Sequence, residues 1–487
     1  MSSPTPQAVA PATSDHPSVR GVLVALSVAM LMTSLGTSIA NVALPTLTQV
    51  FTAPFQAVQW VVIAYLLTIT ALVTTVGRLG DLLGRRRLLL LGLVIFTLAS
   101  LAGGASVSLW QLIAARVGQG VGAALMMALA MALVSEVVPK DKAGGAMGLL
   151  GTVSAVGTAL GPTLGGLLIG AVGWQAVFWI NLPLGAVAFV LAHRHLSPDR
   201  LPAEPGKVRF DPLGTVLLTL SLTAYALSMT LGQGRFGALH IGLLLTAALG
   251  AGAFVVAEGR VAAPLVRPAL FRHPVTGTGF VTSALVTTVV MATLVVGPFY
   301  LGGVLGLDAV RTGLVMSVGP AVAAIAGLPA GRWVDRVGPH QVGLAGLATM
   351  LAGTAALPTA SSAWGVAGYA GTLALITSGY AAFQAANNTT VMASASPDQR
   401  GLVSGLLNLA RNLGLITGAS VMGAVFHAGA STRQIATADP QALAAGLGLT
   451  FLVAAAAVAT AVVLALVGLA AARRAAPIDH AQATRHA

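Results

Sequence analysis

The chain has 487 residues, of which 56% are hydrophobic and only 8% are charged. A soluble domain carries roughly 25% charged residues, so this apolar excess must face a lipid bilayer, and a soluble binding module is excluded. The absence of cysteine excludes disulfides and thiolate metal sites, and the net charge of +12 comes from bases scattered through short segments, which argues against nucleic-acid binding.

Residues 1–20 are polar and rich in proline and serine, without the basic region and cleavage site of a signal peptide. We predict a disordered cytoplasmic tail there. Apolar windows of about 20 residues, the length of a membrane-crossing helix, then recur along almost the whole chain. We predict fourteen spans, which begin near Gly21, Gln59, Leu88, Leu109, Ala143, Gln175, Pro212, Ile241, Thr276, Thr312, Gln341, Gly365, Leu402 and Gly448.

Lysine and arginine are distributed unevenly between the two sides of these spans. Twenty of the 25 bases fall on the side that holds both chain ends, and only Arg235, Arg311 and Arg433 fall on the other. Short loops that are rich in these residues stay in the cytoplasm. The sequence therefore predicts a multi-pass protein of the cytoplasmic (inner) membrane with both termini cytoplasmic.

Two patterns occur twice in the chain at nearly the same separation. The pattern G-R-x-x-D-x-x-G is found at 77–84 and again 254 residues later at 331–338. A glycine spacing of 9 and then 4 is found in Gly148, Gly157 and Gly161, and again 257 residues later in Gly405, Gly414 and Gly418. Because both copies face the same side, the duplication predicts two similar halves around an axis along the membrane normal.

The duplication divides the chain into segments. The predicted fold class is an all-α integral membrane protein with two six-helix bundles, related by a pseudo-two-fold axis, and two inserted central helices. The segments are an N-terminal tail at 1–20, a six-helix bundle at 21–193, a cytoplasmic linker at 194–211, two inserted transmembrane helices at 212–258, a second cytoplasmic linker at 259–274, a six-helix bundle at 275–471, and a cytoplasmic tail at 472–487.

Five stretches carry a resemblance to a known family. They are NVALP at 41–45, GRLGDLLGRRR at 77–87, AARVGQG at 114–120, GLLGTVSAVGTALGPTLGG at 148–166 and WQAVFWINLPLG at 174–185. Over nearly its whole length, the chain resembles the major facilitator superfamily, and in particular its fourteen-helix drug:proton antiporter branch. The resemblance implies a carrier and not an enzyme, which exports amphiphilic drugs or other small organic compounds by alternating access. It also implies that the protein functions as a monomer without a cofactor, with the proton as the candidate coupling ion.

The motif at 77–84 is a candidate gate. Gly77 and Gly84 permit close backbone contact and a tight turn, and Asp81 lies near a helix end, where it can meet a neighbouring helix N-terminus or an arginine. An anchor on the cytoplasmic side is the alternative for Arg85–Arg87. The resemblance implies a conformational latch on the cytoplasmic side, made in the two copies by Gly77, Arg78, Asp81, Gly84, Arg85, Gly331, Arg332 and Asp335.

The span that begins near Ala143 carries a stripe of glycines. Gly157, Gly161 and Gly165 lie four residues apart, and Pro162 favours a bend among them. Close packing of small residues between helices is the simpler interpretation. The resemblance implies an antiporter signature at the interface of the two halves, made by Gly148, Gly157, Gly161, Pro162 and Gly165.

Polar residues inside the spans are candidates for a substrate or coupling path. A charged side chain such as Arg116 is costly within a membrane and usually functional, although an arginine can also extend to the interface. Amides among the spans have a second interpretation as hydrogen bonds between helices. Tyr380 and Phe383 are further candidates for an apolar pocket. The candidate path comprises Asn41, Trp60, Tyr65, Arg116, Gln119, Tyr300, Gln384, Asn387, Asn388, Asn408 and Arg411, the last of which lies beside Asn412.

One position departs from the family pattern. The family usually carries an aspartate nine residues before the proline of NVALP, and this chain has Gly36 there. No carboxylate lies deep in any predicted span, whereas proton coupling normally uses a buried intramembrane acid. Three alternatives are open: Asp81 or Glu136 carries the coupling proton, the carrier is uncoupled or coupled to another ion, or it exchanges anions. Arg116 without an acidic partner favours neutral or anionic substrates.

Other classes of membrane protein lack support in the sequence. An ATP-driven pump needs a phosphate loop, and G-x-x-x-x-G-K-[ST] does not occur. A metalloprotease of the H-E-x-x-H type is excluded because no histidine precedes a glutamate, and we predict no metal site. A channel or a non-transporting sensor on the same fold is the remaining alternative.

Overall fold

The computed structural model describes residues 19–138, 140–199, 212–231, 237–260, 274–394, 400–431, 435 and 438–475. This part of the chain is almost entirely helical and contains no strand, so the predicted all-α fold is confirmed. The predicted tails at 1–20 and 472–487 and the linkers at 194–211 and 259–274 lie largely outside the described residues.

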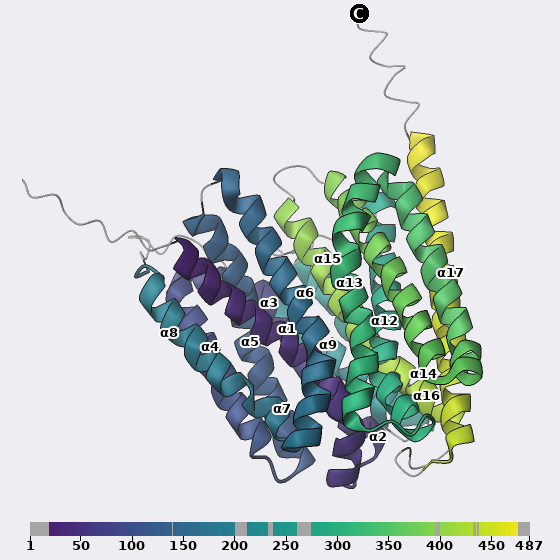
Figure 1. Cartoon of the computed structure of the whole chain (residues 1–487). Helices are drawn as coiled ribbons and strands as arrows, with labels where there is room; N and C mark the ends of the chain where they lie inside the picture. The colour runs from purple at the N-terminus through teal and green to yellow at the C-terminus, as the bar shows by residue number, and fades with distance from the viewer. Residues whose placement is uncertain are drawn as a thin grey trace, which may run out of the picture.

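The helices form two bundles that stand side by side (Figure 1). The N-terminal bundle contains α1 (Val19–Val50), α2 (Phe55–Val58), α3 (Trp60–Leu83), α4 (Arg85–Gly104), α5 (Leu109–Val137), α6 (Lys140–Ala171), α7 (Ala176–Trp179) and α8 (Asn181–His195). The C-terminal bundle contains α12 (Pro274–Gly303), α13 (Ala309–Val337), α14 (Pro339–Ala393), α15 (Arg400–Thr417), the π-helical segment η3 (Gly418–Met422), α16 (Gly423–Ala430) and α17 (Pro440–Ala475).

Thirteen of the described helices are long and apolar enough to cross a membrane. One of them, α14, has 55 residues and contains two spans, because Gly365 adopts φ 55° and ψ −129° and interrupts the helix. The two arms pack against each other: a Cβ on Gly346 would lie 2.7 Å from the carbonyl oxygen of Gly379. Counting both arms, the described helices provide the fourteen predicted spans.

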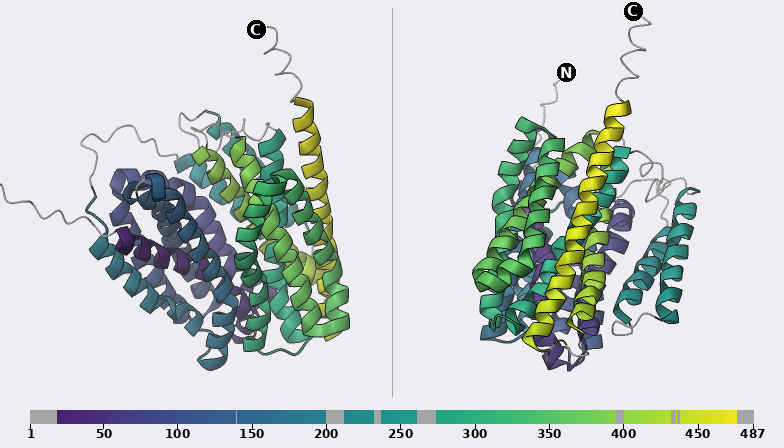
Figure 2. Two further views of the ribbon diagram at one scale, coloured as in Figure 1. Left: turned by 45° about the horizontal axis from the view of Figure 1, so that its top comes forward. Right: turned by 90° about the vertical axis from the view of Figure 1, so that its right-hand side faces the viewer.

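Two helices lie between the bundles in the chain and at one edge of them in space. These are α9 (Pro212–Thr230) and α10 (Ala238–Glu258), seen beside the bundles in the right-hand view of Figure 2. The Thr75 and Thr215 hydroxyls, 2.8 Å apart, join α3 to α9, and the Tyr225 hydroxyl donates to Thr417 at the end of α15 over 3.2 Å. Helix α9 therefore contacts both bundles, and α10 packs against α9.

The duplicated patterns share a backbone turn and a packing position in the two bundles. Gly84 and Gly338, which end the two copies of G-R-x-x-D-x-x-G, have φ values of 97° and 99°, a region that side chains rarely adopt. Gly157 brings α6 against the carbonyl of Leu31 in α1, and Gly414 brings α15 against the carbonyl of Ala284 in α12. Equivalent glycines thus pack the fifth predicted span of each half against the first.

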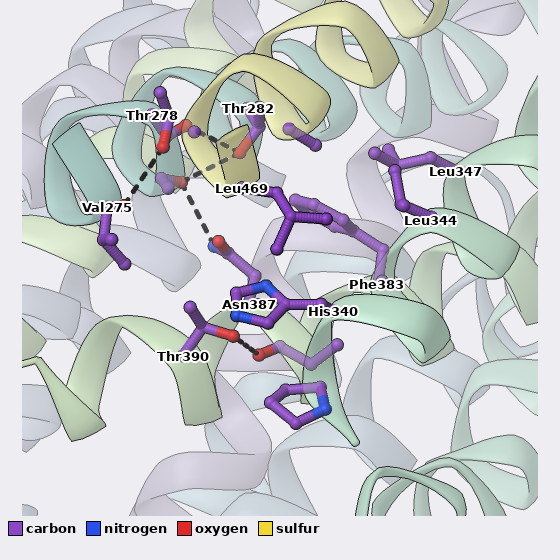
Figure 3. A pocket seen from close by; sticks show the side chains of 16 residues that line it. Val275, Thr278, Thr282, His340, Leu344, Leu347, Phe383, Asn387, Thr390 and Leu469 are labelled. Atoms are coloured by element: carbon purple, nitrogen blue, oxygen red, sulfur yellow. Dashed lines mark hydrogen bonds between the residues drawn. The ribbon is translucent and has the colours of Figure 1, made fainter. Parts of the chain in front are cut away.

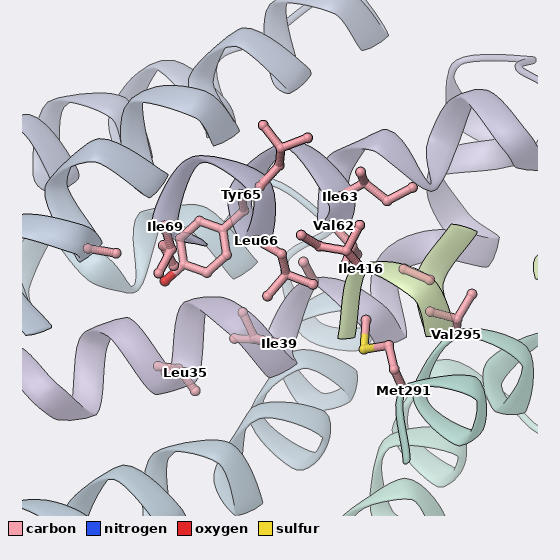
Figure 4. Packing of buried hydrophobic residues seen from close by; sticks show 14 of the residues in the cluster. Leu35, Ile39, Val62, Ile63, Tyr65, Leu66, Ile69, Met291, Val295 and Ile416 are labelled. Carbon is pink, nitrogen blue, oxygen red and sulfur yellow. The ribbon is translucent and has the colours of Figure 1, made fainter. Parts of the chain in front are cut away.

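Both α1 and α17 have their outer chain ends at the same end of the molecule, which we call the terminal end; the opposite one is the far end (Figure 1). Apolar residues of both bundles meet in the middle of the molecule, where Leu35 and Ile39 of α1 lie in one cluster with residues of α3, α12 and α15 (Figure 4). In this cluster the C-terminal bundle contributes Met291, Val295 and Ile416. This packing joins the two bundles beside the cavity that is described next, which Met291 also lines.

Candidate functional site

A cavity of about 360 Å³ lies between the two bundles. Helices α1, α3, α5 and α6 line one side of it, and α12, α13, α14 and α15 line the other. Its volume falls within the range of roughly 300–1,000 Å³ that small-molecule sites occupy. Because both bundles contribute to the lining, a bound molecule would contact both at once.

Most of the cavity lining is apolar or carries a hydroxyl group. The hydroxyls largely bond within their own helices: Thr37 donates to the carbonyl of Thr33 over 3.1 Å, and Thr287 donates to that of Ser283 over 2.6 Å. Ser34 of α1 and Ser154 of α6 pair with each other at 2.6 Å. Threonine and serine in helices commonly use the backbone in this way. These side chains make the cavity mildly polar with their main hydrogen bonds already formed.

Three polar side chains of the lining make no hydrogen bond with a described residue. They are Tyr380 of α14 and the neighbouring Arg411 and Asn412 of α15, and all three are partly exposed. Arg411 makes no salt bridge with any described acid. No Asp or Glu is found among the described lining residues. The cavity thus contains one positive charge and three sets of free hydrogen-bonding groups, all on the C-terminal bundle.

Arg116 lies outside this cavity, inside the N-terminal bundle, with 1% of its surface exposed. Its Nε donates to the carbonyl of Val61 over 2.6 Å, and one terminal nitrogen donates to the carbonyl of Gly36 over 3.0 Å. The other donates to Oε1 of Gln119 over 2.8 Å. The guanidinium carbon lies 4.0 Å from the ring centroid of Tyr65. Neutral oxygens and a ring face thus surround this charge, and it links α1, α3 and α5.

Gly36 belongs to the same cluster. A Cβ at this position would lie 3.2 Å from the Tyr65 hydroxyl oxygen, which itself donates to the carbonyl of Thr33 over 2.8 Å. A carboxylate in place of Gly36 would therefore stand beside Tyr65, and it would stand near Arg116. In this chain no side chain extends from position 36, and Arg116 bonds to the backbone carbonyl of Gly36.

At the far end, aromatic and polar contacts join the two bundles. Phe55 of α2 meets Phe299 of α12 edge to face, with ring centroids 4.7 Å apart, and Phe426 of α16 at 5.9 Å. The side-chain nitrogen of Gln59 donates to the carbonyl of Ala419 over 2.6 Å. These contacts close the space between the bundles on the side opposite the chain ends.

Helices α6 and α13 form a second connection between the bundles towards the far end. The backbones approach closely where Gly166 meets Ala309 and where Gly313 meets the carbonyl of Pro162. The Thr163 and Ser317 hydroxyls share a short hydrogen bond beside them. This approach needs glycine on both helices, because a side chain at either position would meet backbone of the other bundle.

The location predicted for the glycine stripe needs a correction. Helix α6 does lie at the interface of the halves, but Gly157, Gly161 and Gly165 face α1 of their own bundle, against Leu31, Ser38 and Ile39. Of the predicted signature, Pro162 touches the other bundle, and it does so with its carbonyl. The side-chain environment of Gly148 lies outside the described residues. Sequence spacing identified the stripe, but the rotation of the helix decided which neighbour it faces.

At the terminal end, the turn between α3 and α4 is held by an acid that the sequence did not single out. The carboxylate of Asp199, which follows α8, accepts from the backbone N–H groups of Arg86 and Arg87 over 2.8 and 3.0 Å. It therefore caps the first turn of α4. Arg85 forms a salt bridge to Glu136 of α5 at 3.1 Å. The side chains of Asp81 and Arg78, and the surroundings of Gly77, lie outside the described residues.

The second copy of the motif has fewer contacts. Arg332 and Asp335 of α13 are exposed at the terminal end, and neither takes part in a salt bridge with a described residue. A Cβ on Gly331 would meet nothing within 4 Å. The two copies therefore share a backbone turn and differ in what surrounds it.

The remaining candidates for the path lie outside the central cavity. Trp60 donates to the hydroxyl of Thr230 in α9 over 3.0 Å, and Tyr300 stacks on Tyr369 with centroids 6.0 Å apart. Asn41 is fully buried in α1 and donates to the carbonyl of Thr37 over 3.1 Å. Gln384 donates to Asn388 over 3.4 Å in α14, and Asn408 is exposed on α15.

Asn387 and Phe383 line a second, smaller cavity of about 70 Å³ within the C-terminal bundle, between α12, α14 and α17 (Figure 3). The side-chain nitrogen of Asn387 donates to the carbonyl of Gly279 over 3.1 Å, and this hydrogen bond joins α14 to α12. Within the described part of the chain, no three His, Cys, Asp or Glu side chains lie close enough together to hold a metal ion. Of the predicted path, Arg411 lines the central cavity, with Tyr380 and Asn412 beside it.

Comparisons with known proteins agree with this architecture. The family model described as Major Facilitator Superfamily matches residues 26–419. The multidrug resistance protein Stp of Mycobacterium tuberculosis (strain ATCC 25618 / H37Rv) is 33% identical over 413 residues, which is 83% of this chain and 75% of that protein. The riboflavin transporter RibZ of Clostridioides difficile (strain 630) is 30% identical over 408 residues, 83% of this chain and 88% of that protein.

Among solved structures, a bacterial homolog of the human lysosomal transporter Spinster, in an inward-facing and occupied conformation, aligns with a TM-score of 0.68. The alignment covers 93% of this chain and 97% of that one at 17% sequence identity. At that identity the likeness concerns the fold alone.

Proposed function

This chain belongs to the Major Facilitator Superfamily, and we propose that it is a secondary active exporter of small amphiphilic compounds that works by alternating access. The central cavity carries this proposal, because residues of both bundles line it. A substrate held there can be exposed to either side when the bundles move relative to each other. Mostly apolar lining with a few polar groups suits an amphiphilic molecule.

The positions of the contacts between bundles support a rocking movement. The aromatic contacts of Phe55 and the approach of α6 to α13 lie towards the far end, while the ribbons of the two bundles diverge towards the terminal end (Figure 1). The excess of bases at the terminal end favours a cytoplasmic location for it. In this orientation the structure corresponds to a state that is closed towards the outside and loads from the cytoplasm.

The name of one relative supports the direction of transport and the class of compound that we propose. Stp carries the name of a multidrug resistance protein, and the glycine pattern of α6 resembles that of antiporters. Export of amphiphilic compounds is therefore the function that we propose. No acid is found in the described cavity lining. The ion that drives transport is therefore to be identified by experiment.

The proposal is tested with purified protein in proteoliposomes, on a panel of cationic, neutral and anionic amphiphiles, with and without an imposed pH gradient. We expect saturable flux that is far slower than channel conduction. Protein-free liposomes measure passive leakage. Non-saturable, channel-like flux would contradict a carrier, and no flux of any compound at confirmed protein incorporation would favour the sensor alternative.

A further inference from the structure

We propose that the central cavity selects amphiphiles that carry a negative charge, such as a carboxylate, and that Arg411 binds this anionic group. The inference rests on the proposed function as a carrier and adds a substrate class to it. Four observations support it: the charges of the cavity, the free donors of Arg411, the different state of Arg116, and the apolar lining.

The charge of the cavity is positive. Arg411 is its one charged residue among the described lining, and no described carboxylate lines it. The acids whose side chains the structure describes lie at helix ends or in loops; they are Glu136, Asp199, Glu258, Asp308, Asp335 and Asp439. An effective dielectric constant well below that of water strengthens the influence of a charge in such a site. A cationic substrate would meet repulsion here, and an anionic one attraction.

Arg411 has its donors available. A guanidinium has five N–H donors in a planar fork that fits a carboxylate in a two-point contact. None of these donors bonds to a described residue, and Asn412 and Tyr380, which line the same cavity, are likewise without a described partner. The hydroxyls around them are already bonded to their own helices. The groups that remain for a ligand are therefore a cation, an amide and a phenol.

Arg116 shows what a structural arginine looks like in the same protein. Its three nitrogens donate to Val61, Gly36 and Gln119, and its face covers Tyr65. It is fully buried and does not line the cavity, so a substrate there cannot reach its donors. None of its hydrogen-bond partners is an acid, so its positive charge is not neutralised. This charge adds to the positive potential inside the protein, while Arg411 contacts the anionic group of the substrate.

The rest of the cavity is suited to the apolar body of the substrate. Leu66 and Ile69 of α3 line it from the N-terminal bundle, and Met291, Met316 and Leu373 line it from the C-terminal bundle. Methionine adapts to different shapes. The lining thus selects the charge of the substrate at Arg411, and its apolar part accepts substrate bodies of different shapes.

The test uses three dansyl compounds that share an apolar body and differ in charge: dansylglycine is anionic, dansylglycinamide is neutral, and dansylcadaverine is cationic. Binding to wild type, Arg411→Lys and Arg411→Gln is measured by fluorescence titration in detergent. Uptake is measured in phosphatidylcholine proteoliposomes, so that no anionic lipid competes, and again with phosphatidylglycerol added. Arg311→Gln, an exposed arginine outside the cavity, is the matched control.

We expect wild type to bind dansylglycine tighter than dansylglycinamide, and dansylcadaverine most weakly. Arg411→Gln should weaken dansylglycine binding by about tenfold to a hundredfold, the range for a hydrogen bond to a charged group, and leave the amide nearly unchanged. Arg411→Lys should retain part of the affinity, and Arg311→Gln all of it. Weaker dansylglycine uptake with phosphatidylglycerol in wild type, but not in Arg411→Gln, would identify the lipid headgroup as a competing ligand of the same site and support the assignment, because repulsion by the vesicle surface affects both proteins equally.

Transport that favours the cation, or dansylglycine affinity that Arg411→Gln leaves unchanged, would overturn the inference while the carrier function stands. Absence of flux for every compound in wild type would overturn both. The two failures are therefore distinguishable.

Discussion

At the scale of single residues, the two arginines within the spans show how the same side chain takes opposite roles. Arg116 is fully buried and bonded to three oxygens, whereas Arg411 reaches a cavity without a described partner. A buried charge is tolerated only when its hydrogen bonds are satisfied. Arg116 therefore stabilises the N-terminal bundle, whereas the donors of Arg411 are available to bind a ligand.

This difference predicts unequal effects on stability. Arg116→Gln removes charge-assisted hydrogen bonds that join three helices, and we expect it to lower the free energy of unfolding by roughly 1–3 kcal/mol. Arg411→Gln removes no described contact and should stay within about 0.5 kcal/mol of wild type. Thermal unfolding in detergent, followed by tryptophan fluorescence, compares the two. Equal losses would contradict the assigned roles.

Gly36 permits a second test at the residue scale. Gly36→Asp would place a carboxylate beside the Tyr65 hydroxyl, since a Cβ there lies 3.2 Å from that oxygen. We expect this added negative charge to shift the ratio of cation to anion uptake by about tenfold towards the cation. Gly36→Asn, which has the same size and no charge, is the control. The same shift in both variants would mean that shape rather than charge is responsible.

At the scale of elements, the turn between α3 and α4 combines a strained backbone position with an acidic cap. Gly84 has φ 97°, and a Cβ on it would collide with the carboxylate of Asp199. That carboxylate accepts from the first backbone N–H groups of α4. The segment after α8 is thereby tied to the motif that the sequence marked as a gate.

The equivalent turn at Gly338 separates the two effects. It has φ 99°, and a Cβ on it would meet nothing within 4 Å. Gly338→Ala should lower stability by about 1 kcal/mol through backbone strain alone, and Gly84→Ala by more, because it also displaces Asp199. Asp199→Ala should lower stability by about 0.5–2 kcal/mol, the usual cost of replacing a helix cap by alanine. Thermal unfolding measures all three, and equal effects of the two glycine variants would exclude a contribution from Asp199.

At the scale of the whole molecule, alternating access requires that contacts between bundles form and break. Helices α6 and α13 meet without side chains at Gly166 and Gly313, so their backbones touch directly. Such close surfaces allow bundles to separate and rejoin with few interlocking side chains. The same closeness makes this contact sensitive to added volume.

Gly313→Val is therefore expected to prevent closure at the far end and to lower transport at least about tenfold, because its side chain would meet the carbonyl of Pro162. Gly327→Val is the matched control, since it lies on the same helix and a Cβ there meets nothing within 4 Å. Uptake per reconstituted protein is the measurement. Full activity of Gly313→Val would show that this contact is dispensable.

The sequence alone determined the class of protein, the fourteen spans, the duplication and the tight turn at Gly84. These depend on local properties: the length of apolar windows, the spacing of glycines, and the backbone freedom of glycine at a turn. The same local properties predicted the pairing of α6 with a close neighbour. They did not decide whether that neighbour was α1 or α13.

The tertiary structure decided which residues share a site. It placed Arg411 in the cavity and Arg116 in a bundle interior, assigned Asp199 as the cap of α4, and turned the glycine stripe towards α1. One signal in the sequence did point to the cavity side of α15, because Arg411 and Asn412 are neighbouring polar residues within a predicted span. The rest depends on how each helix is rotated about its axis and which helix lies opposite, and these follow from packing among residues far apart in the chain.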